Sequence, residues 1–121
     1  MEGWLGKQKP GGFAHKYNKR YCKFLDDGRT FAFSEKKEDF DKNKVKRKIP
    51  LSDVLEIIHK EKPLKFQLVC QGRVFKFEAG SLEEKTRWLR ALTVCQEFAQ
   101  KYDEAVKKKM ESLDSDIKFS E

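Results

Sequence analysis

The sequence predicts a mainly β domain, a seven-stranded antiparallel barrel or sandwich capped by one long C-terminal α-helix. Three observations carry this prediction. The first 80 residues alternate between short β-like runs and turn-forming residues. The pattern changes at Ser81 to the period of an amphipathic helix. The length of 121 residues leaves room for one domain with one core.

The expected strands are short and are joined by recognisable turns. Asp26-Asp27-Gly28 and Gln71-Gly72 predict tight hairpin turns, because glycine adopts positive φ at no steric cost. The charged segment 35–44 is expected to be a long loop. The strands are expected at residues 3–7, 17–25, 30–34, 45–51, 54–60, 64–70 and 73–77.

The expected helix begins with a capping box, Ser81-Leu82-Glu83-Glu84, in which Ser81 and Glu84 satisfy backbone N–H groups of the first turn. Its buried face is predicted from apolar residues at spacings of four, three, four and three, flanked by Leu89 and Phe98. These residues are Trp88, Leu92, Cys95, Ala99 and Tyr102. We expect the helix to continue to about Met110 and residues 114–121 to be frayed or disordered. The predicted division is a domain over 1–103 and a helix extension with a tail over 104–121.

The positive charge of the chain is concentrated in its first half. Residues 1–50 hold 14 Lys and Arg against 7 Asp and Glu, whereas the remaining residues hold 13 of each. A local basic field of this kind favours an acidic partner over a merely solvated surface.

The cysteines and the N-terminal residues indicate in which cellular compartment the protein is expected. Three cysteines, an odd number without a CxxC pair, favour a reducing compartment, and hence a cytoplasmic protein. No stretch reaches the roughly 20 apolar residues of a membrane span, and Met1-Glu2-Gly3-Trp4 fits neither a signal peptide nor a myristoylation site. Membrane contact is therefore expected to be peripheral, through the folded surface.

Catalysis has little support in the sequence. His15 and His59 are the two histidines, and neither belongs to a cluster with metal-ligand spacing. Gly11-Gly12 lacks the ending of a phosphate-binding P-loop, and no GxSxG occurs. We therefore expect no catalytic residue, metal or cofactor. Aromatic and basic residues alternate over 16–21, as on a nucleic-acid stacking platform, but nucleic acid is the less favoured partner.

Several segments together resemble the pleckstrin-homology (PH) family, over about residues 2–103. The match to the first two strands lies in Gly3-Trp4-Leu5-Gly6-Lys7 and Lys19-Arg20-Tyr21-Cys22-Lys23-Phe24-Leu25. Ile49-Pro50-Leu51-Ser52-Asp53-Val54 resembles the fourth strand and the following turn. The segment from Glu83 to Leu92, with Trp88, resembles the helix that closes one end of the barrel.

The resemblance implies a site for phosphoinositides or other anionic headgroups at the open end of the barrel. Lys7 matches the first basic position of the family motif and Arg20 the last, while Asn18 stands where the motif has Lys or Arg. Phe33 lacks the hydroxyl that tight binders often carry there. The expected lipid-binding residues are Lys7, Lys9, Lys16, Lys19, Arg20, Lys46 and Lys48.

Two further surfaces are considered. Phe13, among basic and small residues, is either inserted into the headgroup–acyl boundary or folded back onto the barrel. The alternative to lipid binding is a protein-docking module that uses the sheet or the extended helix, where Tyr102, Val106 and Met110 form an apolar strip.

Overall fold

The computed structural model describes residues 1–9 and 16–119. Within them are seven strands, all close to the predicted ranges: β1 (Glu2–Gln8), β2 (Tyr17–Leu25), β3 (Thr30–Ser34), β4 (Arg47–Pro50), β5 (Val54–Ile58), β6 (Lys65–Cys70) and β7 (Arg73–Glu78). Two helices, α1 (Glu38–Asp41) and α2 (Leu82–Phe119), complete the chain.

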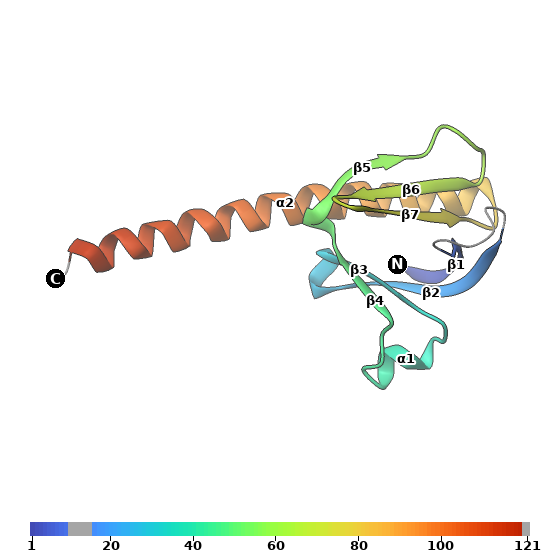
Figure 1. The fold of residues 1–121 in the computed structure, drawn as a ribbon, viewed down its shortest axis with the longest axis horizontal. Helices are drawn as coiled ribbons and strands as arrows, with labels where there is room; N and C mark the ends of the chain where they lie inside the picture. Colours follow the sequence, from blue (N-terminus) through green and yellow to red (C-terminus); the bar gives the residue numbers. More distant parts are fainter. Residues whose placement is uncertain (10–15, 120–121) are drawn as a thin grey trace.

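The strands form one antiparallel sheet in the order β4-β3-β2-β1-β7-β6-β5. The sheet bends over on itself, so that β5, β6 and β7 lie across from β2, β3 and β4 (Figure 1). Helix α2 runs past the barrel and projects well beyond it. The predicted fold class is therefore confirmed.

The core fills the space between the two parts of the sheet. Phe31 lies at its centre, with ring centroids 5.6 Å from Phe77 and 5.9 Å from Trp88. Of the stripe predicted on α2, Trp88, Leu92 and Ala99 are at most 3 % exposed, whereas the prediction is wrong for Tyr102, which is 42 % exposed. The strands and the turns next to them contribute the other core residues, mostly from alternate positions. These are Leu5, Cys22, Phe31, Phe33, Ile49, Leu51, Val54, Phe66, Leu68, Phe75, Phe77 and Ala79.

The start of α2 is capped almost as the sequence predicts. The Ser81 hydroxyl accepts the Glu84 backbone N–H at 3.1 Å. The Glu84 carboxylate, however, accepts the N–H of Gly80, at 3.2 Å, one residue before the predicted partner. The first bond satisfies a donor that the first helical turn leaves open, and the second fixes the chain just before the helix.

The far end of α2 differs from the sequence prediction. The helix continues to Phe119, past the expected end near Met110 and into the segment predicted to be frayed. No Gly or Pro follows Gly80, so nothing in the sequence breaks the helical pattern. The division of the chain at residues 103 and 104 stays a prediction.

The segment 35–44 was expected to be a loop, and this expectation is wrong in its middle, where α1 forms. The Asp39 carboxylate accepts the Ser34 hydroxyl at 2.6 Å and the Lys36 N–H at 3.3 Å, which closes the turn. Phe40 of α1 packs edge-on against Tyr21, with centroids 5.9 Å apart. Tyr21 lies on the face of β2 opposite the core residue Cys22, yet its side chain is also buried.

Glycine is required where the β2–β3 turn meets α2. Gly28 has φ +90°, and a Cβ placed there would lie 3.1 Å from the Cys95 sulfur. A larger residue would therefore meet both backbone strain and a clash. The three cysteines are free thiols; Cys22 is fully buried and burial raises its pKa to about 12.

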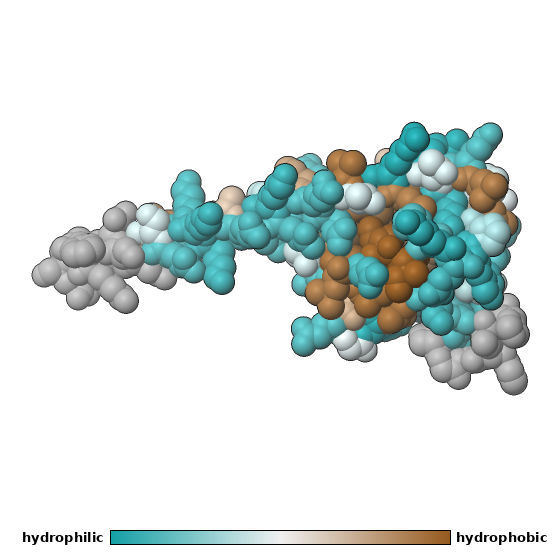
Figure 2. Space-filling view, turned by 90° about the horizontal axis from the view of Figure 1, so that it is seen from above, coloured by the Kyte–Doolittle hydropathy of each residue, from teal (hydrophilic) through white to brown (hydrophobic). Residues whose placement is uncertain are grey.

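Within the described residues, no helix is both long and apolar enough to cross a membrane. The hydrophobic side chains visible in Figure 2 gather on the barrel, while the projecting part of α2 shows a mostly hydrophilic surface in this view. The long helix is therefore an amphipathic element attached to a folded barrel.

Trp88→Ala tests the role of α2 in closing the barrel. Loss of this buried ring is expected to lower the free energy of unfolding by about 3–5 kcal/mol. The variant loses the favourable free energy of transferring the ring from water to the core, and a cavity is left in its place. The measurement is urea unfolding followed by circular dichroism. Phe98→Ala, on the same helix but 50 % exposed, is the matched control and should cost under about 1 kcal/mol. Equal losses in the two variants would contradict the packing described.

Candidate anion-binding site

A cleft of about 450 Å³, here named the inner cleft, opens at one end of the barrel. Its lining is unusually basic, with six cationic side chains and one carboxylate. The lining residues are Lys7, Lys9, Asn18, Arg20, Phe33, Glu35, Lys46, Arg47 and Arg73.

Strand direction brings these residues together. Antiparallel pairing places the end of β1 beside the start of β2, and the end of β3 beside the start of β4. Because β7 also pairs antiparallel with β1, its first residue lies toward the same end. Three loops therefore meet at one end of the barrel, here named the loop end. Trp88 packs beside Gly3, Phe24 and Phe31 at the opposite end.

Lys7 is the most enclosed cation of the inner cleft. It is only 9 % exposed, and its amine lies 5.3 Å from the centre of the Phe33 ring. Its amine donates to the Gln8 carbonyl at 3.3 Å. Burial, followed by repulsion from Arg73, Arg20, Lys46 and Arg47, lowers the pKa of Lys7. An incoming anion would relieve this repulsion.

Glu35 pairs with two of the cations. Its carboxylate lies 2.9 Å from the Lys46 amine and 3.7 Å from the Arg20 guanidinium. The hydrogen bond from Lys46 and the charges of Lys46 and Arg20 lower the pKa of Glu35, so the carboxylate is ionised at neutral pH. Glu35 therefore competes with any external anion for these two side chains.

Two arginines flank the Phe75 ring. The guanidinium carbons of Arg73 and Arg47 lie 4.5 and 5.7 Å from its centroid. Burial, together with repulsion from Arg47, lowers the pKa of Arg73. Stacking on an aromatic face holds guanidinium groups in place while leaving their N–H donors available.

The chemistry of the inner cleft is that of an anion receptor. Guanidinium groups bind phosphate or carboxylate through paired hydrogen bonds, and lysines add mobile point charges. Across the part of the chain that the structure describes, no three His, Cys, Asp or Glu side chains come together as a metal site would require.

The structure brings together four of the seven expected lipid-binding residues: Lys7, Lys9, Arg20 and Lys46. Lys19 lies on the opposite face of β2 and lines a groove between β1 and α2. Lys48 lies on the face of β4 opposite that of its neighbour Arg47. Both Lys48 and Lys16 are exposed and lie outside the inner cleft. Phe13, the expected insertion residue, lies outside the described residues.

Three charged contributors were not among the expected site residues: Arg47, Arg73 and Glu35. Arg73 begins β7 directly after the predicted Gln71-Gly72 turn, so strand counting alone would have placed it at the loop end. Glu35 gave no such signal, because it was one acidic residue in a charged segment whose path the sequence did not predict.

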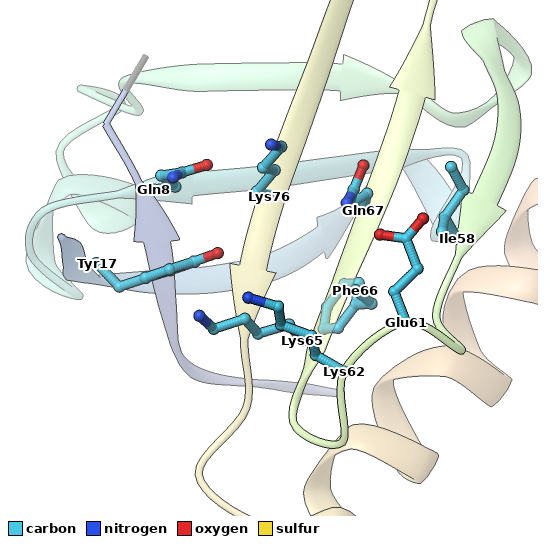
Figure 3. Close-up of a pocket in the computed structure, with 9 residues that line it drawn as sticks. All are labelled: Gln8, Tyr17, Ile58, Glu61, Lys62, Lys65, Phe66, Gln67 and Lys76. Atoms are coloured by element: carbon cyan, nitrogen blue, oxygen red, sulfur yellow. The ribbon is translucent and has the colours of Figure 1, made fainter. Parts of the chain in front are cut away.

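A second concavity, here named the outer pocket, has a volume of about 300 Å³ on the outside of the barrel (Figure 3). Lys62, Lys65 and Lys76 line it together with Glu61 and with Tyr17 from β2. Lys65 is already engaged, since its amine lies 4.6 Å from the Tyr17 ring centre and 3.9 Å from Glu78.

Both concavities flank the β1–β2 hairpin. Lys7 and Asn18 are opposite each other in the pairing and line the inner cleft, whereas the next pair, Gln8 and Tyr17, lines the outer pocket. This division follows from the alternation of side chains along a strand.

The PH domain model matches residues 1–97. This chain belongs to the PH domain family. Among solved structures it is similar to the PH domain of human oxysterol binding protein-related protein 11, with a TM-score of 0.70, 15 % identity, and coverage of 84 % of this chain and 83 % of the other.

Two further PH domains show the same likeness. The N-terminal PH domain of human ARAP2 has a TM-score of 0.61 at 28 % identity, covering 79 % of this chain and 77 % of the other. The carboxyl-terminal PH domain of pleckstrin has a TM-score of 0.66 at 16 % identity, covering 79 % and 95 %. A comparison with curated protein sequences gives no match. PH domains are modules for lipid or protein binding and are generally non-catalytic.

Glu35→Gln tests the competition inside the inner cleft. Removing this carboxylate should tighten binding of a soluble polyphosphate such as inositol hexakisphosphate by about two- to fivefold, the size expected of an exposed ion pair. Isothermal titration calorimetry at constant low ionic strength measures the change. Glu38→Gln removes the same charge from α1, outside the cleft, and should leave affinity nearly unchanged. An equal gain in both variants would indicate a general charge effect.

Proposed function

We propose that this PH domain is a non-catalytic membrane-targeting module, peripheral at the cytoplasmic face of membranes. Its ligand is the headgroup of a phosphoinositide or another anionic phospholipid, bound in the inner cleft. The observation that carries the proposal is the convergence of six cationic side chains on one cleft that holds a single carboxylate.

The electrostatics of the inner cleft favour a multiply charged ligand. Lys7 carries its charge in a partly desolvated position close to other cations, and its pKa is lowered accordingly. A phosphomonoester brings up to two negative charges and several acceptor oxygens to this position. Binding therefore replaces repulsion with charge-assisted hydrogen bonds.

Three residues favour moderate affinity with limited selectivity among headgroups. Glu35 must give up its contacts with Arg20 and Lys46 before a headgroup takes both. Asn18 supplies no charge opposite Lys7, and Phe33 presents a ring where a hydroxyl would add a donor. Membrane attachment would then depend on the density of anionic lipid as well as on headgroup identity.

Vesicle binding tests the proposal. The probe is a set of phosphatidylcholine vesicles with and without a phosphoinositide, measured by co-sedimentation. Lys7→Met and Arg20→Met should each weaken binding by about tenfold or more, because each removes a charge-assisted hydrogen bond. Methionine keeps much of the apolar stem that packs in each position.

The outer pocket provides the matched control. The double variant Lys62→Met/Lys76→Met removes two cations outside the inner cleft and should bind nearly as well as the parent chain. Binding that survives Lys7→Met and Arg20→Met but fails in the control variant would assign the headgroup to the outer pocket. Absence of phosphoinositide-dependent sedimentation in the parent would reject the lipid proposal.

A further inference from the structure

Strand β1 has a free edge over its first half. On one side all of β1 pairs with β2. On the other side, within the described part of the chain, the pairing with β7 covers only Gly6 and Lys7. The chain leaves β7 after Glu78 and turns into α2, so no strand continues beside residues 2–5. The backbone N–H and C=O groups on this edge are therefore open to pairing with another chain.

A groove of about 690 Å³, here named the edge groove, runs along the free edge. Consecutive residues of β1, from Glu2 to Gly6, line it. Because side chains of a strand alternate between two faces, a groove lined by consecutive residues follows the edge of the strand and not one face. The far wall of the edge groove is formed by the connection from β7 and by Glu84, Arg87 and Trp88 in the first turns of α2.

The dimensions of the edge groove suit a short extended peptide. Four residues of a strand span about 13 Å, at about 3.3 Å per residue. Gly3 and Gly6 leave two positions along the groove without a side chain. Glycine inside a strand often marks a place where another backbone approaches closely. A peptide main chain can therefore come within hydrogen-bonding distance of β1.

Trp4 provides an apolar contact beside the free edge. Its ring is 47 % exposed and is held edge-on against Tyr21, with ring centroids 5.2 Å apart. Two residues further along the same face of β1 comes Gly6, which is opposite Lys19 of β2 in the pairing. Since Gly6 has no side chain, Lys19 borders the edge groove from the neighbouring strand. Tryptophan and arginine, here Trp4 and Arg87, are among the residues that contribute most to binding at interfaces.

The uncompensated charge of the edge groove is positive. Lys19 and Arg87 are exposed, and neither forms an ion pair with a carboxylate of the described residues. The three carboxylates of the groove, by contrast, already have partners. These pairs are Glu2 with the Tyr21 hydroxyl, Glu78 with the Lys65 amine at 3.9 Å, and Glu84 with the Gly80 N–H at 3.2 Å. An acidic side chain would complement the two unpaired cations.

We propose that the edge groove binds an extended peptide of another protein, which adds to β1 as a further strand. The peptide main chain hydrogen-bonds to the free edge of residues 2–5. Two peptide side chains, two positions apart and so on the same face, provide selectivity. One is apolar and packs on the Trp4 ring, and the other is acidic and lies beside Lys19 and Arg87. The inference does not rest on the proposed lipid function, since the edge groove and the inner cleft share no lining residue in the part of the chain that the structure describes.

A random dodecapeptide library displayed on phage is the probe, with the 121-residue chain as bait. Selection should enrich peptides that carry an apolar residue and Asp or Glu two positions apart. A synthetic copy of the most enriched peptide is then titrated by fluorescence anisotropy. Lys19→Met/Arg87→Met should weaken its binding by about fivefold or more, because up to two exposed ion pairs are lost. Lys62→Met/Lys76→Met removes the same charge from the outer pocket and should bind the peptide as the parent does.

Trp4→Ala tests the apolar contact. The same peptide should bind this variant about tenfold more weakly or worse, because an aromatic anchor is lost. Urea unfolding checks that the variant remains folded, since Trp4 also packs on Tyr21. Leu55→Ala is the matched control: Leu55 is an exposed apolar residue of β5, outside the edge groove, and its loss should leave affinity unchanged.

Amide hydrogen exchange measured by NMR tests the main-chain pairing. Along a strand the N–H groups alternate between the two edges, so half of the amides of residues 2–5 point toward β2 and half toward the edge groove. A saturating concentration of the peptide should slow exchange of the amides that point toward the groove by about tenfold or more. Unchanged exchange at these amides would contradict strand addition.

Three other results would overturn the proposal. One is a selection that enriches no peptide. Another is an enriched peptide whose binding survives both Trp4→Ala and Lys19→Met/Arg87→Met, or falls in Lys7→Met, which would place its site elsewhere. The third is a parent chain that dimerises in sedimentation velocity and becomes monomeric in Trp4→Ala, which would assign the edge groove to a second copy of this chain.

Discussion

The packing of Trp88 is the contact on which the rest of the domain depends. Its ring stacks 6.1 Å from Phe24 and meets Phe31 edge-on, and Phe31 in turn contacts Phe77 across the barrel. One helix residue thus ties together strands from both parts of the sheet. Helix α2 fills this end, and the cations gather at the loop end, where the inner cleft opens.

The β1–β2 hairpin divides the surface into two basic concavities through strand alternation alone. Lys7 points toward the core and lies over the Phe33 ring, where burial of its charge lowers stability. Its neighbour Gln8 points to the opposite side and lines the outer pocket. A buried cation among other cations is a poor arrangement for stability. An anion bound beside Lys7, as we propose, would offset this cost.

Much of the fold could be predicted from residue patterns, because strand alternation, turn glycines and the helix cap are local signals. β2 and β3 begin and end at the predicted residues. The lining of the inner cleft was harder to predict, since it depends on contacts between segments that are distant in the sequence. Lys7 and Arg20 were identified from a sequence motif, but Arg73 reaches the cleft through the pairing of β7 with β1. Glu35 depends on how the β3–β4 segment folds around Asp39, which no periodic pattern encodes.

Cys22 has a consequence of a different kind. Its sulfur is fully buried on the inner face of β2, and the raised pKa keeps it a thiol rather than a reactive thiolate. A soluble alkylating reagent can reach it only when the barrel opens. The rate at which Cys22 is modified therefore reports how often the barrel opens around β2, and a ligand that stabilises the native state would lower this rate.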